Sequence, residues 1–133
     1  MDKMKGQSLV EFAISLVFLL IFLSGTVEFG ISFFQFIQLR DAVQEGALFG
    51  SVCQNDATIE ERIRNASNAP LDLNDASVSV LIDYPEGEGV AVRTRASYEH
   101  KVFMPFASVF AGKYIHISAS VTDTILVEKT DCG

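Results

Sequence analysis

The pattern of hydrophobic and polar positions changes twice along the 133 residues, and the first part is almost entirely apolar. Residues 12–27 contain no charged side chain, and after Glu28 the apolar character resumes over residues 29–39. A bilayer core about 30 Å thick takes roughly 20 helical residues, so this run is longer than one crossing needs. It predicts a transmembrane helix, with its span over about residues 9–37, that extends outward beyond the bilayer.

The helical spacing of apolar residues continues past the membrane segment. Leu39, Val43 and Ala47 follow one another at intervals of four, which places them on one face of a helix. Gly50 and Ser51 are typical of a helix end, and the loop-like sequence "CQNDA" comes shortly after them. The pattern therefore predicts one continuous helix over residues 7–50.

A short helix is expected after this loop. Asp56 or Thr58 can cap it, and Thr58 and Glu61 have the spacing of a capping box. Pro70 then forbids its continuation, because proline lacks the backbone N–H that the helix needs.

Beyond Asn74 the period of the apolar residues changes from near 3.6 to 2, which indicates β-strands. Strands are expected over residues 76–84, 90–103 and 114–128. The first two form a hairpin around "PEGEG", whose glycines can take positive φ, and "MPFASVFAGK" interrupts the pattern before the third. The residues that share one face in the three strands are Val78, Val80 and Ile82; Val90, Val92, Thr94 and Ala96; and Ile115, Ile117, Ala119 and Val121.

These elements predict an α+β fold, with a long amino-terminal helix, a short helix, and a small antiparallel β-meander of three strands. Such a meander buries one of its faces only if another element covers it. The outer part of the long helix, residues 33–49, is the expected cover.

The charged residues are distributed unevenly. The formal net charge of −7 argues against a sequence-independent nucleic-acid binder, because such binding relies on Lys and Arg that neutralise phosphates. Lys3 and Lys5 precede the apolar run, whereas residues 54–133 carry twelve acidic and seven basic side chains. By the positive-inside rule, the amino end stays in the cytoplasm and residues 51–133 form an exported domain. We expect a single-pass protein of the cytoplasmic membrane.

Two acidic residues, Glu11 and Glu28, flank the uncharged run. An acid at the centre of a bilayer costs about 2.5–3.5 kcal/mol, and less near the ends, so each acid needs a partner or a place at the interface. Glu28 lies about 26 Å of helix beyond Glu11, which suits a membrane-interface position at the outer headgroups. Glu11 either reaches the inner headgroups or meets a positive charge.

The residues around Glu11 resemble a known processing site. In "GQSLVEF", Gly6 is followed by four residues and then by Glu11 and Phe12, behind a short basic leader. This resembles the processing site of type IV pilins and, more narrowly, of the tight-adherence (Flp) pilus proteins. The resemblance implies that a prepilin peptidase cuts between Gly6 and Gln7, so that residues 1–6 are a leader peptide. The new amine on Gln7 would meet the Glu11 carboxylate of the same or a neighbouring subunit, which makes Glu11 and Phe12 the expected register residues of assembly.

The resemblance extends over residues 6–50. "EFGISFFQFIQLRDAVQEGALFG" resembles the amino-terminal region of TadE-like proteins, which are minor pseudopilins of the tight-adherence pilus, and "LRDAVQEGA" is similar to that family's Leu-x-x-Ala-x-x-Glu-Gly-Ala pattern. Val17 departs from the proline that many members carry, and Phe12 departs from the tyrosine of the major Flp pilins. The resemblance implies a pilin-like fold and, as partners, the prepilin peptidase, other pilins or pseudopilins, the pilus assembly machinery and membrane lipid.

Three further features have two interpretations each. Gly46 and Gly50, with small neighbours, either let another helix approach closely or admit the protein's own sheet or short helix. Cys53 and Cys132 either form a disulfide in an oxidising exported compartment, closing a loop of about 80 residues, or remain thiols. The apolar cluster at residues 102–110 is either an exposed partner surface or a loop tucked into the core, and we favour the second.

Nothing in the sequence points to catalysis. His100 and His116 are isolated, and the motifs of hydrolases, metalloproteases, redox centres and phosphate-binding loops are absent. We therefore expect no enzyme, no catalytic residue, no metal and no cofactor. The sequence predicts a TadE-like minor pseudopilin whose helix packs into a pilus or its initiation complex, with incorporation into the extracellular filament left open. The alternative is an unprocessed single-pass anchor that carries an extracytoplasmic binding or adhesive domain.

Overall fold

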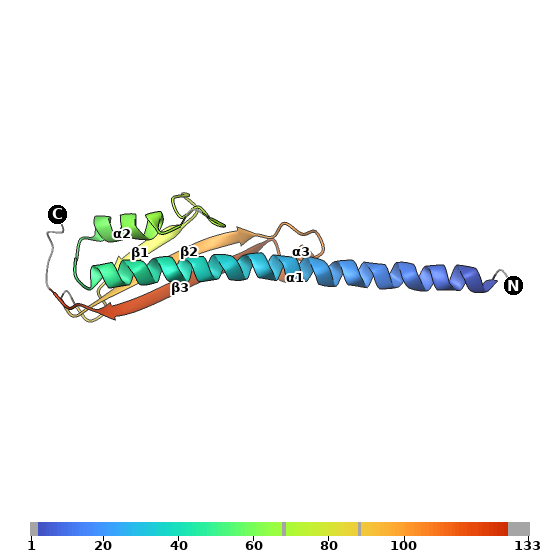
Figure 1. The fold of residues 1–133 in the computed structure, drawn as a ribbon, viewed down its shortest axis with the longest axis horizontal. Coiled ribbons are helices and arrows are strands. Elements are labelled where there is room, and N and C mark those ends of the chain that lie inside the picture. The colour runs from blue at the N-terminus through green and yellow to red at the C-terminus, as the bar shows by residue number, and fades with distance from the viewer. Residues whose placement is uncertain (1–2, 68, 88, 128–133) are drawn as a thin grey trace. The chain divides into compact units, whose positions relative to one another are not determined.

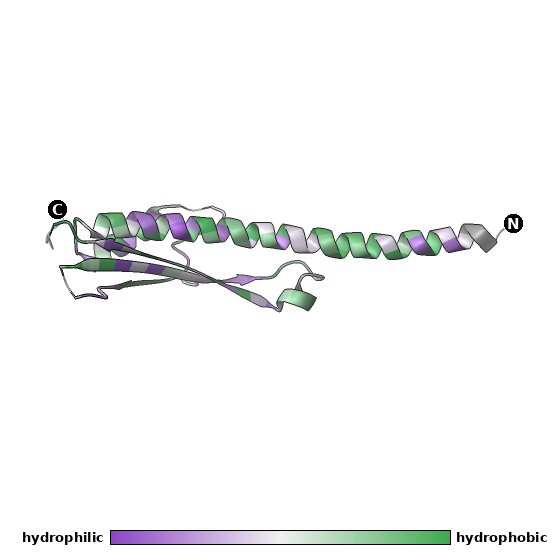
Figure 2. Ribbon diagram, turned by 90° about the horizontal axis from the view of Figure 1, so that it is seen from below, coloured by the Kyte–Doolittle hydropathy of each residue, from purple (hydrophilic) through white to green (hydrophobic). Residues whose placement is uncertain are grey.

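The computed structural model describes residues 3–67, 69–87 and 89–127. Helix α1 (Lys3–Gly50) is followed by α2 (Asp56–Asn65), β1 (Ser79–Asp83), β2 (Ala91–Lys101), the short α3 (Ser108–Ala111) and β3 (Tyr114–Thr124) (Figure 1). The strands form one antiparallel sheet in the order β1-β2-β3. Hydrophobic residues predominate in the amino-terminal half of α1 (Figure 2). The helices and the antiparallel sheet together confirm the predicted α+β fold.

The element boundaries differ in detail from the predicted ones. β1 begins at Ser79 rather than residue 76, and β2 ends at Lys101 rather than residue 103. β3 ends at Thr124, whereas its predicted end, residue 128, lies outside the described residues. The segment "MPFASVFAGK" contains α3, which the two-residue period of the strands did not indicate.

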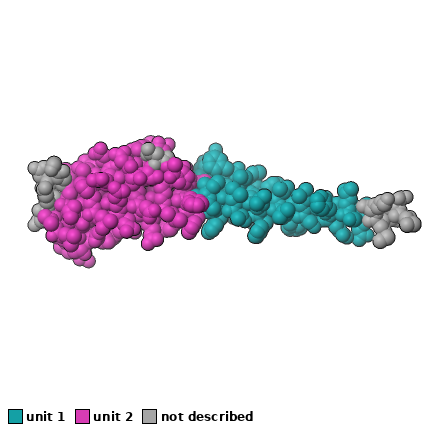
Figure 3. Space-filling model, in the orientation of Figure 1, with its two compact units in different colours: residues 1–31, 101–115 teal, residues 32–100, 116–133 magenta. Residues whose placement is uncertain are grey.

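The chain divides into two compact units (Figure 3). Unit 1 comprises residues 1–31 and 101–115, so it groups the first part of α1 with the connection between β2 and β3. Unit 2 comprises residues 32–100 and 116–133 and contains the rest of α1, α2, β1 and most of the other two strands. The domain boundary after residue 50 stays a prediction.

One face of the sheet forms the core of unit 2. In β2, Val92, Thr94 and Ala96 are fully buried, at the two-residue spacing that puts side chains on one face of a strand. In β3, Ile117 and Ala119 are buried in the same alternation. The predicted inward positions of these two strands are confirmed for these residues.

The last part of α1 covers this face of the sheet. Leu39, Val43 and Ala47 are fully buried, and each large apolar side chain removed from water contributes about 1.5–3 kcal/mol. The Thr94 hydroxyl of β2 donates a hydrogen bond to the Val43 carbonyl oxygen at 2.6 Å. The prediction that the outer part of the long helix covers the meander is therefore confirmed.

Helix α2 is capped by Asn55, so the predicted cap at Asp56 or Thr58 is wrong. The Asn55 backbone is extended, and its side-chain oxygen accepts a hydrogen bond from the Thr58 backbone N–H at 3.2 Å. Asparagine supplies the acceptor that the first turn of a helix needs. With Asn55 as the cap, the helix begins at Asp56, whereas a cap at Asp56 would make it begin one residue later. Asp56 then lies in the first turn, where the helix dipole favours an acid.

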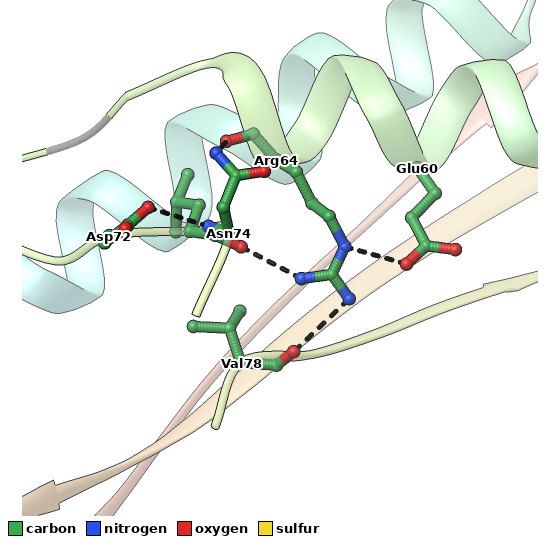
Figure 4. Close-up of polar contacts among 6 residues, drawn as sticks. Glu60, Arg64, Asp72, Asn74 and Val78 are labelled. Atoms are coloured by element: carbon green, nitrogen blue, oxygen red, sulfur yellow. Dashed lines mark hydrogen bonds and ion pairs between the residues drawn. The ribbon is translucent and has the colours of Figure 1, made fainter. Parts of the chain in front are cut away.

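Arg64 fixes the segment that follows α2 (Figure 4). Its Nε donates to Glu60 Oε1 at 2.8 Å, and its two terminal nitrogens donate to the carbonyl oxygens of Leu73 at 3.0 Å and Val78 at 3.5 Å. The Asn74 side chain donates to the Arg64 carbonyl oxygen at 3.3 Å. One guanidinium therefore joins α2 to the chain that leads into β1.

Candidate assembly site on the long helix

Helix α1 presents three kinds of surface in succession. Residues 6–23 are almost entirely apolar and are exposed on nearly all sides. Over residues 24–38 the buried side chains are polar and the exposed ones are mainly apolar, whereas over residues 39–50 the buried side chains are apolar and most of the exposed ones are polar. The polarity across the helix therefore reverses at Leu39.

We call residues 24–38 the reversed stretch. Its buried residues are Ser24, Glu28, Ser32, Gln35 and Gln38, at intervals of three and four that place them on one face. Its exposed large apolar residues are Val27, Phe29, Phe33, Phe34, Phe36 and Ile37. A helix in water has the opposite arrangement, so the outward face of the reversed stretch requires an apolar covering.

Gln38 shows how the chain satisfies a polar group of the reversed stretch. Its side-chain nitrogen donates to the Leu71 carbonyl oxygen at 2.6 Å, and its side-chain oxygen accepts from the Leu71 N–H at 2.9 Å. Buried backbone groups need such partners. Gln38 therefore fixes the segment after α2 against α1.

Glu28 makes the corresponding contact within unit 1. Its side chain is only 2% exposed, and its two carboxylate oxygens accept hydrogen bonds from the backbone N–H groups of Phe103 at 3.1 Å and Met104 at 3.2 Å. Hydrogen bonds to an ionised group are about twice as strong as neutral ones. Glu28 therefore holds the connection between β2 and β3 on α1. Its position at the outer membrane interface stays a prediction.

The predicted processing and register residues lie at the start of α1. Gly6 and Gln7 are exposed, and a Cβ at Gly6 would meet nothing within 4 Å. The Gln7 side-chain nitrogen donates to Glu11 Oε1 at 3.2 Å, and Phe12 is exposed. Gln7 and Glu11 therefore lie on the same face, one helical turn apart. Cleavage after Gly6 and the register role of Glu11 and Phe12 stay predictions.

Gly46 and Gly50 lie where the protein's own elements approach α1. A Cβ at Gly46 would collide with the Ile63 side chain of α2, and a Cβ at Gly50 would lie 3.1 Å from side-chain atoms of Ile59 and Val92. Of the two interpretations of these small residues, the structure supports close packing on the protein's own short helix and sheet.

The apolar cluster at residues 102–110 is largely exposed, so the favoured interpretation of a loop tucked into the core is wrong. Val102 is buried, but Phe103, Val109 and Phe110 are each exposed by two-thirds or more. The backbone N–H groups of Phe103 and Met104 attach the segment to α1, while the side chains of Phe103, Val109 and Phe110 remain largely exposed.

Cys53 is buried directly after α1 and is not a free thiol. The Leu126 N–H donates to the Ser51 carbonyl oxygen at 2.8 Å, so the chain beyond β3 returns to the end of α1. Cys132 lies outside the described residues. The pairing of Cys53 with Cys132 therefore stays a prediction.

The partners of two buried polar residues could not be found from the sequence. Glu28 is separated from Phe103 by 75 positions and Gln38 from Leu71 by 33, and no local pattern connects such pairs. The available signal was the spacing of the polar residues within the apolar run, because intervals of three and four mark a single helix face.

One of three comparisons with known proteins finds a match, and the matched residues lie within α1. The comparison with curated proteins finds no match, and neither does the comparison with solved structures. A family model described as TadE-like protein matches residues 6–48. The matched segment contains the predicted processing site, the reversed stretch and the part of α1 that covers the sheet. Over this amino-terminal segment, the chain is similar to TadE-like proteins.

Proposed function

We propose that this protein is a minor pseudopilin of the tight-adherence pilus, anchored in the cytoplasmic membrane by α1 and packed through α1 into the pilus or its initiation complex. The TadE-like family suggests a component of this pilus and is not known as a family of enzymes. Among the described residues, one helix, Gly6–Gly50, is long and apolar enough to cross a membrane. The charge distribution favours a cytoplasmic amino end and an exported domain at residues 51–133.

The observation that carries this proposal is the length of helix that needs an apolar surrounding. Exposed apolar side chains continue over residues 9–37, which extend about 43 Å along the axis at 1.5 Å per residue. A hydrocarbon core about 30 Å thick, crossed at an average tilt of about 20°, accounts for roughly 21 residues. The remaining two turns include Phe34, which is 66% exposed. Neighbouring pilus subunits would cover them.

Processing after Gly6 would prepare the amino end for assembly. It would leave a free amine on Gln7, about 6 Å along the helix axis from Glu11. An unpaired carboxylate inside a bilayer is costly, and an amine offsets that cost only when the geometry is correct. A pairing between Glu11 of one subunit and the amine of its neighbour would therefore favour one register between the two helices.

The alternative, an unprocessed single-pass anchor with an extracytoplasmic binding or adhesive domain, uses the same helix without cleavage or polymerisation. Mass spectrometry of the protein purified from membranes distinguishes the two. A mass that lacks residues 1–6 supports the pseudopilin. An intact amino end in cells that carry the tight-adherence machinery supports the anchor and contradicts the pseudopilin.

Replacement of Glu11 tests the register hypothesis. Glu11→Gln keeps the shape of the side chain but removes an interaction of about 2 kcal/mol or more, which corresponds to a more than tenfold weakening of subunit contact. We expect a trimmed subunit and few surface fibres. Glu61→Gln, which removes an exposed acid of α2, is the matched control and should leave the fibre count unchanged. A normal fibre count with the trimmed Glu11→Gln subunit would exclude this role for Glu11.

A further inference from the structure

We propose that the connection between β2 and β3, residues 102–112, is a second membrane-inserted element that enters the outer leaflet beside α1. We call this segment the inserted loop. Its partner is the hydrocarbon of a lipid bilayer. The inference rests on the proposed crossing of the membrane by α1 and adds a contact that the crossing alone does not require.

The composition of the inserted loop favours an apolar surrounding. Its sequence, "VFMPFASVFAG", contains no charged side chain, and Lys101 and Lys113 flank it directly. Phe103 and Val109 are largely exposed, and Phe110 is 78% exposed. Exposed apolar patches of this kind mark surfaces that contact a membrane or another protein.

The inserted loop packs, within unit 1, on the part of α1 that the bilayer would surround. An apolar hollow of about 320 Å³ is lined by Leu20, Leu23 and Val27 of α1 and by Met104 and Phe106 of the loop. Leu20 and Val27 lie about 17 Å and about 27 Å beyond Leu9 along the helix axis. They therefore lie in the outer half of a core about 30 Å thick. The loop is at the same depth, and the hollow would hold acyl chains.

Several backbone N–H groups of the inserted loop have acceptors within the chain, which suits hydrocarbon because lipid offers no partner to a free N–H or C=O group. The N–H groups of Phe103 and Met104 donate to the Glu28 carboxylate. In α3 the bonds are internal, with the Ala111 N–H donating to the Ala107 carbonyl oxygen at 2.9 Å. Glu28 therefore supplies the loop with acceptors that water would otherwise provide.

The residues beside the inserted loop suit the headgroup region. Lys101, Lys113 and Tyr114 are exposed, and the Lys113 ammonium lies 5.6 Å from the centroid of the Tyr114 ring. Lysine side chains extend their charge from apolar surroundings toward water and phosphate, and tyrosine is enriched at the membrane interface. This charge complementarity, together with the continuity of the loop with the apolar surface of α1, favours lipid over a protein partner.

Tryptophan fluorescence tests the insertion, because the chain contains no tryptophan of its own. The full-length protein is reconstituted into vesicles of phosphatidylcholine and phosphatidylglycerol, with and without brominated acyl chains. Phe110→Trp reports on the inserted loop, and two exposed positions are the matched controls: Phe22→Trp in α1 and Leu81→Trp in β1. We expect bromine to quench Phe110→Trp about as strongly as Phe22→Trp and to leave Leu81→Trp unquenched.

The outcomes separate this inference from the proposed function. If Phe22→Trp is quenched and Phe110→Trp behaves like Leu81→Trp, α1 crosses the bilayer but the loop does not enter it, and the inference is wrong. If Phe22→Trp is not quenched, the crossing by α1 is wrong, and with it the proposed function. A short-wavelength emission from Phe110→Trp without bromine quenching would indicate contact with a second copy, which also overturns the inference.

A second reporter guards against a change in the loop caused by the substitution itself. Val109→Trp replaces a neighbouring side chain that is equally exposed, so the new ring displaces no core residue. It should be quenched like Phe110→Trp. If neither reporter is quenched while Phe22→Trp is, insertion of the loop is excluded.

Discussion

The two parts of α1 that pack on the rest of the chain bury opposite kinds of residue. Residues 39–50 bury Leu39, Val43 and Ala47, as an amphipathic helix in water does. The reversed stretch buries Glu28 and Gln38 and exposes its phenylalanines. The difference teaches that a helix buries the side chains that its surroundings cannot accommodate: apolar side chains in water, and polar side chains in apolar surroundings.

The energetic reason differs between the two parts. Burial of an apolar side chain contributes about 25 cal/mol per Å² only when the alternative is water. Next to lipid or the helix of another subunit, a phenylalanine loses nothing by facing outward. A carboxylate or a carboxamide would find no partner there, and Glu28 and Gln38 are bonded to backbone groups of their own chain, as the proposed surroundings require.

The largest expected effect comes from removal of the buried acid. Glu28→Ala leaves the amides of Phe103 and Met104 without this acceptor, at a cost of about 3 kcal/mol or more, because hydrogen bonds to charged groups contribute about 1.5–3 kcal/mol each. We expect faster hydrogen exchange at these two amides in detergent. Glu28→Gln keeps one acceptor oxygen and should lose less. Unchanged exchange in both variants would show that the carboxylate does not hold the loop.

A smaller effect is expected from an added methyl group where α1 is closely packed. Gly46→Ala places a Cβ against Ile63, which is fully buried, and overpacking of this kind costs about 1–3 kcal/mol. Gly30→Ala is the matched control, because its Cβ would meet nothing within 4 Å and alanine is the better helix former by up to about 1 kcal/mol. The free energy of unfolding should fall in the first variant and stay equal or rise in the second. Equal losses would mean that the packing of α2 on Gly46 does not stabilise the fold.

The smallest effect is expected away from α1, at the pair formed by Asp83 and Arg93 on neighbouring strands. The hydrogen bond from the Arg93 guanidinium lowers the pKa of Asp83 below its ordinary value. A carboxyl whose pKa is lowered by folding stabilises the fold above its unfolded-state value of about 3.9, and this contribution is lost as the pH falls through the folded-state pKa. Asp83→Asn should therefore lower the thermal midpoint slightly at neutral pH and not in acid.

The control for this pair is Asp41→Asn, which removes an exposed acid of α1 without touching the two strands. A pH-independent difference between Asp83→Asn and the unchanged protein would mean that the ion pair does not contribute.

The elements of the fold could be predicted because their signals are local. The alternation through Val92, Thr94 and Ala96 fixes the inward face of β2 whatever surrounds it. The cap of α2 was missed by one residue because Asn55, Asp56 and Thr58 are all capping types, and only the backbone geometry selects among them.

The exposed loop was missed for a different reason. Apolar composition indicates burial in water, but the phenylalanines of residues 102–110 are exposed, as the proposed insertion into lipid would require. The reversed stretch, too, could be predicted only in part. Its polar face is visible in the spacing of Glu28, Ser32 and Gln35, but the backbone groups that it meets lie far along the chain.

The most direct test of the central claim, that neighbouring subunits cover the outward face of α1 beyond the bilayer, is site-specific photo-crosslinking in cells that assemble the tight-adherence pilus. A benzophenone-bearing amino acid replaces Phe34 in one strain and Leu81, an exposed residue of β1, in another. We predict a covalent adduct between position 34 and another pilus subunit, and none from position 81. Normal fibres without any protein adduct at position 34 would contradict the claim.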